Sequence, residues 1–287
     1  MISIFCKNNG VTREFPEGTS LLEMLPSFDF NQPYPIVSAR VNNVSQGLKY
    51  KAYNSKDVEY VDCTDPSGGR VYCRSLCFLL SKAAQDVLPK SRIYMEHPIS
   101  GGYFCNFVKK GGEPATEADV VAIRKRMKEL VEEDLPFHRY EARLEDGVKI
   151  FKEMGYDDKV KLLETSGQAY TDYYTLGDSA DYYYGRLVPS TGYLKVWALD
   201  HYNGGMLLRT PDAENPTRPT QLFPQPKTFE VFSENLRWNI IMGLTNVGDV
   251  NHACLNGRAS ELIQVSEALQ EKKIVQIAEE ITRRAKQ

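Results

Sequence analysis

Two cysteines four residues apart, Cys73 and Cys77, are the residues of this sequence whose type and spacing best suit binding of a metal ion. Residues four apart lie on one face of a helix, so two thiolates at this spacing have the geometry to share a metal ion. The same positions also belong to the apolar stripe of a predicted helix, which favours packing in a core. No Cys-x-x-Cys pair occurs among the six cysteines and the chain has four histidines, so we expect buried, reduced thiols.

Aromatic and basic residues also cluster along the chain. A run of tyrosines, Tyr182–Tyr184, follows three others at 170, 173 and 174. Such rings either stack on nucleic-acid bases or fill space in a core, and the second interpretation is favoured. The basic run Arg124–Arg126, with Lys128, has the charge to contact phosphates. Glutamates at 129, 132 and 133 follow it directly, which favours a solvated helix face.

The first 62 residues have the pattern of a small β-grasp unit. Strands are predicted at 2–6, 11–15, 36–41 and 58–61, with a hairpin turn at Asn8-Asn9-Gly10. Ser20 and Glu23 have the spacing of a capping box and predict a short helix through Leu25. The Pro-Ser-Gly-Gly stretch at 66–69 is predicted to be a linker.

The remaining elements follow from periodicity and from turn residues. Helices are predicted over 73–87, over 116–130 with Thr116 as the N-cap, and over 144–151, closing on Gly155. Gly101-Gly102 predicts a tight turn into a strand, and 193–210 predict a hairpin around Asn203. Prolines predict an extended connector over 211–226, and apolar stripes at 229–240, 262–269 and 274–281 predict C-terminal helices.

The composition is that of a globular protein of about two domains, with 42% hydrophobic and 25% charged residues. A net charge of −3 argues mildly against tight binding of RNA by the chain as a whole. No apolar run approaches the ~20 residues that a membrane span needs, and the N-terminus lacks the pattern of a signal peptide. We therefore expect a cytoplasmic protein with no membrane partner.

The order of these features resembles the N-terminal half of threonyl-tRNA synthetases. Ile36–Val44, IVSARVNNV, matches a characteristic turn of their TGS domain, and Val71–Pro89 resembles their first editing helix. His97–Phe107 resembles the family's glycine turn, and Asp181–Pro189 its later loop. The resemblance implies an α+β fold. It would comprise a β-grasp TGS domain (1–63), a threonyl/alanyl-tRNA-synthetase editing-like domain (64–226) and C-terminal helices (227–287).

The ligands that this resemblance implies for a metal are replaced. The family's first editing helix carries His-x-x-x-His, and the matching positions here are Arg74 and Phe78. Its later loop carries Cys-x-x-x-His, and the matching positions are Tyr183 and Leu187. Phenylalanine and leucine bind no metal, and arginine stays protonated. We therefore expect a degenerate site with no catalytic residue and no metal.

Two polar positions of the family's pocket are kept, Lys159 and Asp181. Together with the four replaced positions they define what we call the predicted pocket: Arg74, Phe78, Lys159, Asp181, Tyr183 and Leu187. Either this pocket holds a ligand, or the two polar residues remain only as a surface ion pair or a structural hydrogen bond. The second interpretation is favoured.

Beyond residue 226 the sequence departs from the synthetases. Glu234–Ile281 resembles uridine-kinase-family proteins of bacteria, in which TGS and editing-like modules precede a P-loop kinase domain. The chain contains no Gly-x-x-x-x-Gly-Lys-Ser/Thr. The resemblance thus implies that 227–287 lead into a kinase domain outside this sequence, with ATP and Mg²⁺ as its cofactors.

The expected function is that of a non-catalytic binding or regulatory region of a nucleoside kinase that phosphorylates uridine. The expected partners are that kinase domain and tRNA or another structured RNA, and self-association also fits. The alternative is a free-standing tRNA-binding protein or trans-editing hydrolase related to threonyl-tRNA synthetase.

Overall fold

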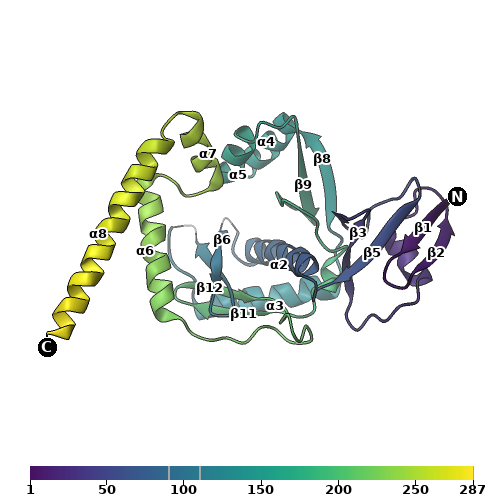
Figure 1. Cartoon of the computed structure of the whole chain (residues 1–287), viewed down its shortest axis with the longest axis horizontal. Helices are drawn as coiled ribbons and strands as arrows, with labels where there is room; N and C mark the ends of the chain where they lie inside the picture. The colour runs from purple at the N-terminus through teal and green to yellow at the C-terminus, as the bar shows by residue number, and fades with distance from the viewer. Residues whose placement is uncertain (90, 110, 287) are drawn as a thin grey trace. The chain divides into compact units, whose positions relative to one another are not determined.

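The computed structural model of the chain describes residues 1–89, 91–109 and 111–286 and contains both helices and strands (Figure 1). The predicted α+β class is confirmed. The chain divides into two compact units. The first contains Met1–Tyr140 and Asp172–Pro226, and the second contains Glu141–Thr171 and the residues from Lys227 onward. The boundaries at residues 63 and 226 stay predictions.

The N-terminal sheet has the mixed topology of a β-grasp, with strand order β2-β1-β5-β3-β4. β1 pairs antiparallel with β2 and parallel with β5. The predicted capping box is present, because Ser20 Oγ accepts the Glu23 N–H and the Glu23 carboxylate accepts the Ser20 N–H. The elements are β1 (Ile2–Cys6), β2 (Val11–Phe15), α1 (Leu21–Met24), η1 (Leu25–Ser27), β3 (Ile36–Val41), β4 (Val44–Gln46) and β5 (Lys56–Asp62).

The rest of the first unit is built around a long helix, α2, which packs against a second helix, α3. A four-stranded antiparallel sheet of order β11-β12-β7-β6 completes a separate core with them. The elements are α2 (Pro66–Val87), β6 (Arg92–Ile99), β7 (Gly102–Val108), α3 (Glu117–Glu133), β10 (Ser179–Asp181), η2 (Thr191–Tyr193), β11 (Ala198–Tyr202) and β12 (Gly205–Arg209). β8 (His138–Arg143) and β9 (Tyr170–Leu176) form a three-stranded sheet with β10.

The linker predicted at 66–69 is wrong, because these residues form the first turn of α2. Asp65 is the N-cap and its carboxylate accepts the Ser67 N–H at 2.8 Å, while Pro66 occupies the first turn. A Cβ on Gly68 would lie 1.9 Å from the Asp62 carbonyl oxygen. This glycine therefore permits close packing of the helix rather than flexibility.

Helices make up most of the second unit. They are α4 (Leu144–Glu153), α5 (Asp157–Glu164), α6 (Pro226–Met242), α7 (Val247–Leu255) and α8 (Ala259–Ala285). α5 and α7 are joined by an ion pair, Lys161 Nζ to Asp249 Oδ1, of 2.8 Å. The last two apolar stripes belong to one helix, α8, and the side chain of Leu262 in that stripe lies outside the described residues. No described helix is both long and apolar enough to cross a bilayer.

Candidate functional site

Five of the six residues of the predicted pocket belong to the first unit. Arg74 and Phe78 lie on α2, Asp181 ends β10, and Tyr183 and Leu187 lie in the loop that follows. The loop is tied to the helix through Ser75, whose Oγ accepts the Val188 N–H at 3.0 Å. Ser75 also donates to the Val71 carbonyl one turn earlier. The structure therefore places the late loop against the helix face that carries Arg74 and Phe78.

Apolar side chains fill the centre of this arrangement. Phe78 is 1% exposed, and its ring centroid lies 5.4 Å from that of Tyr183 and 5.8 Å from that of Phe137. Leu187 is buried in the same core. Ring pairs at these separations are favourable contacts. Tyr183 thus fills space, as predicted for the tyrosine run, whereas the neighbouring Tyr184 is 88% exposed.

Arg74 closes the edge of the arrangement by contacting backbone. Its Nε donates to the Arg186 carbonyl at 3.3 Å, and a Cβ on Gly185 would lie 2.9 Å from the Arg74 guanidinium carbon. Gly185 has a φ of +123°, a conformation that favours glycine. Burial lowers the pKa of Arg74. Arginine nevertheless stays protonated in proteins, so Arg74 cannot act as a base.

Asp181 is 8% exposed and its carboxylate accepts the Tyr182 N–H at 2.7 Å. Burial, together with the charge of Asp181, raises the pKa of Tyr183 well above its ordinary value, so this phenol stays neutral. Lys159 lies on α5 of the second unit and does not share a compact unit with the other five residues. That all six residues form one pocket therefore remains a prediction.

A group of thiols lies beside the predicted pocket. Cys77 is in the core and Cys73 is half-buried. Hydrogen bonds from Cys77 and Tyr103, together with the charge of Arg74, lower the pKa of Cys73 against the opposing effect of burial. Burial raises the pKa of Cys105 to about 12. Cys73 is thus the thiol of this group that most readily ionises.

Sequence reasoning missed Tyr103 and Cys105 as neighbours of Cys73. Both lie on β7 two residues apart, so strand alternation places them on one face of the sheet. That signal is present in the sequence, but only the fold shows which helix covers the face. Among residues 1–89, 91–109 and 111–286, no three His, Cys, Asp or Glu side chains are arranged to hold a metal ion.

Similarity to known proteins agrees with the fold. The chain is 30% identical over 200 residues to the threonine–tRNA ligase of Carboxydothermus hydrogenoformans. The matched region covers 69% of this chain and 31% of the ligase. It is 30% identical over 196 residues to the enzyme of Desulforamulus reducens (68% and 30%) and 28% identical over 197 residues to that of Marinobacter nauticus (68% and 30%). No family model matches the chain.

Proposed function

We propose that the chain binds tRNA and does not hydrolyse mischarged tRNA by the route used in editing domains. It contains a threonyl-tRNA-synthetase-like region and spans about a third of the length of the curated relatives it matches. The similarity to threonine–tRNA ligases supports the first part. The packing of Phe78 against Tyr183, at 5.4 Å, is the observation that carries the second.

Ester hydrolysis requires a group that activates water or attacks the carbonyl carbon. Phe78 and Leu187 have no such group, and Arg74 carries a permanent positive charge. The raised pKa of Tyr183 keeps its phenol protonated. None of these four side chains can take a proton from water at neutral pH.

The test measures binding and hydrolysis on the same sample. We expect the purified chain to shift tRNA for threonine in a native gel, and to leave the ester intact when the tRNA is charged with serine, the analogue that lacks one methyl group. If the ester is hydrolysed, the second part is wrong. Asp181→Asn and Cys73→Ser would then tell whether the carboxylate or the ionisable thiol is responsible. If no tRNA binds, the first part is wrong.

A second candidate function is that of an accessory region of a uridine kinase. It is motivated by the resemblance of Glu234–Ile281 to that family and by apolar side chains on α6 and α8 that are exposed: Ile240 67%, Ile241 70%, Ile274 59% and Ile281 62%. A following kinase domain, with ATP and Mg²⁺, is the partner that this resemblance implies. The coding sequence after Gln287 decides. A strand and a Gly-x-x-x-x-Gly-Lys-Ser/Thr loop would support this function, and a stop codon would contradict it.

A further inference from the structure

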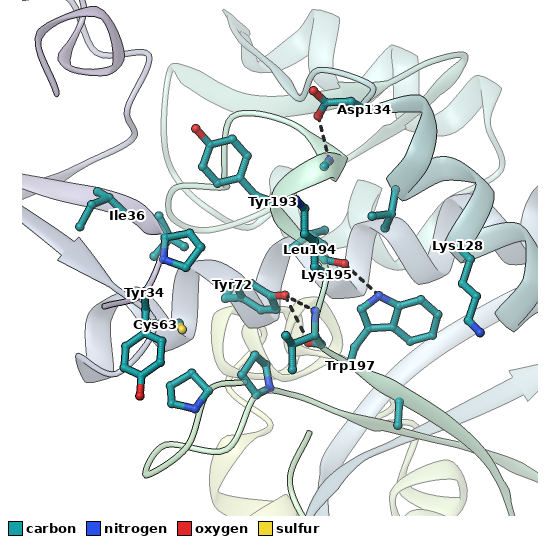
Figure 2. A pocket seen from close by; sticks show the side chains of 18 of the residues that line it. Tyr34, Ile36, Cys63, Tyr72, Lys128, Asp134, Tyr193, Leu194, Lys195 and Trp197 are labelled. Carbon is teal, nitrogen blue, oxygen red and sulfur yellow. Dashed lines mark hydrogen bonds between the residues drawn. The ribbon is translucent and has the colours of Figure 1, made fainter. Parts of the chain in front are cut away.

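A groove of about 1150 Å³ lies in the first unit, away from the predicted pocket (Figure 2). The region of Tyr34 and Cys63 lines one side, α3 lines another through Arg124 and Lys128, and the segment from Gly192 to Leu199 runs along it. Sites for small ligands usually measure about 300–1,000 Å³, so the groove has room for a nucleoside phosphate. None of the six predicted pocket residues lines it.

Aromatic rings in the groove have their polar atoms satisfied within the protein. Trp197 is half-buried, and its Nε1 donates to the Leu194 carbonyl at 2.9 Å. The Tyr72 hydroxyl accepts the Val196 N–H at 3.0 Å and donates to the carbonyl of the same residue. Figure 2 shows both rings fixed in this way along the groove. Tyr72 is 5% exposed, so its ring is part of the groove wall. Trp197 is only half-buried and its hydrogen bond is already made, so what it can offer a ligand is an apolar face for stacking.

The charges that line the groove favour an anion. Arg124 donates to the Leu199 carbonyl rather than to a carboxylate. Lys128 and Lys195 are exposed, and in the part of the chain that the structure describes neither makes an ion pair. Among the described residues, none of these three cations has a carboxylate partner.

Three carboxylates also line the groove, and among the described residues one of them is in an ion pair. Asp200 pairs with Arg209 Nε at 2.7 Å. Asp134 accepts the Gly192 N–H at 2.9 Å, and its charge also acts on Lys49. Glu132 is exposed and is the remaining carboxylate. With Asp200 paired to Arg209, three cations stand against two carboxylates, so the groove has an excess of one positive charge beside the ring of Trp197.

We propose that this groove binds a nucleoside phosphate, with the base stacked on Trp197 and the phosphate held by Lys128 and Lys195. Rings that stack on bases beside cations that contact phosphate are the usual means of binding nucleotides without regard to sequence. The same chemistry fits a free mononucleotide and one nucleotide of a single-stranded RNA. The groove is a second site, separate from the predicted pocket.

Trp197 itself reports on occupancy, because the chain has only one other tryptophan, Trp238. In a Trp238→Phe background, the emission of Trp197 is titrated with AMP and, separately, with a short single-stranded oligoadenylate. We expect saturable quenching. Quenching by AMP alone would identify a free nucleotide as the ligand, and quenching by the oligonucleotide alone would identify RNA. No saturable change with either probe would overturn the proposal.

Charge-reversal variants test the assigned contacts. Lys128→Glu with Lys195→Glu should weaken binding about tenfold or more, because two phosphate contacts are lost. Both side chains are exposed, so the fold should be retained. Lys125→Glu is the matched control, since Lys125 lies on the same helix with 81% of its side chain exposed and does not line the groove. Equal losses in both variants would contradict the proposal. If the Lys128→Glu, Lys195→Glu variant binds AMP and oligoadenylate as the wild type does, the groove proposal is wrong. Should the chain still bind tRNA in that case, the proposed function stands.

Discussion

Phe78 lies where the resemblance implies a histidine, and its ring is held on two sides by Tyr183 and Phe137. A histidine side chain at this position would be buried among these rings and would need a hydrogen-bonding partner there. The surrounding residues therefore stabilise a large apolar side chain. Replacing Phe78 alone with histidine would therefore not restore hydrolysis of mischarged tRNA.

Phe78→Ala should destabilise the chain by about 3–5 kcal/mol, because a buried ring is lost and a cavity remains. Urea unfolding followed by circular dichroism measures the difference. Phe5→Ala is the control, since Phe5 is 37% exposed on β1 and its loss should cost much less. Equal effects of the two substitutions would show that Phe78 is not a packing residue.

Part of this site could be predicted from the sequence. Helical period places Arg74 and Phe78 on one face, and residue types alone show that neither can bind a metal. The neighbours of Cys73 could not be predicted in the same way. Tyr103 and Cys105 come from β7, and which strand a helix covers depends on tertiary packing rather than on local pattern.

At the scale of the element, α2 decides how the first unit is assembled. Its N-cap, Asp65, also binds Arg40 of β3 at 2.7 Å, so one carboxylate fixes the helix start and ties it to the N-terminal sheet. The Gly68-Gly69 pair made this turn resemble a linker in the sequence. Local composition favoured a break there, whereas the cap and the close approach to Asp62 require a helix.

Gly68→Ala should lower the free energy of unfolding by about 3 kcal/mol, at the upper end for overpacking, because the new Cβ meets backbone at 1.9 Å. Gly69→Ala is the matched neighbour. Its Cβ would lie 3.4 Å from the nearest atom, so the gain in helix propensity should leave stability unchanged or raise it by up to about 1 kcal/mol. A linker at 66–69 would instead tolerate both substitutions equally, as thermal unfolding would reveal.

Asp65 should make stability depend on pH in the acid range. Burial raises the pKa of Asp65, but hydrogen bonds from Ser67 and Arg40 outweigh it, and the pKa falls from 3.8 to about 2. A lowered pKa means that this contribution is complete above pH 3.8 and is lost as the pH falls towards 2. Asp65→Asn keeps a capping side chain but should lose this part of the pH dependence. If the wild type and Asp65→Asn lose stability with the same dependence on pH in acid unfolding, the assigned contribution of Asp65 is wrong.

Considered as a whole molecule, the chain has a net charge of −3, which does not by itself favour RNA. The groove nevertheless has three cations that make no ion pair among the described residues, and they lie beside the ring of Trp197. Binding of RNA, if it uses these contacts, depends on local rather than on global charge. The location of this positive charge could not be predicted from composition and required the fold.

Affinity for tRNA should fall about tenfold or more between roughly 50 and 200 mM salt, because even two or three phosphate contacts release bound counterions. Fluorescence anisotropy with labelled tRNA measures this dependence. The Lys128→Glu, Lys195→Glu variant should show a shallower slope, while Lys125→Glu should match the wild type. An affinity independent of salt would be incompatible with phosphate contacts.

A single-turnover assay tests most directly whether the chain binds tRNA without hydrolysing it. Serine-charged tRNA for threonine is mixed with an excess of the chain at a concentration that saturates binding, and the ester that remains is followed over time. The predicted result is a bound tRNA whose ester decays at the rate measured without protein. Decay that is faster in the complex, and that increases with the fraction bound, would contradict it.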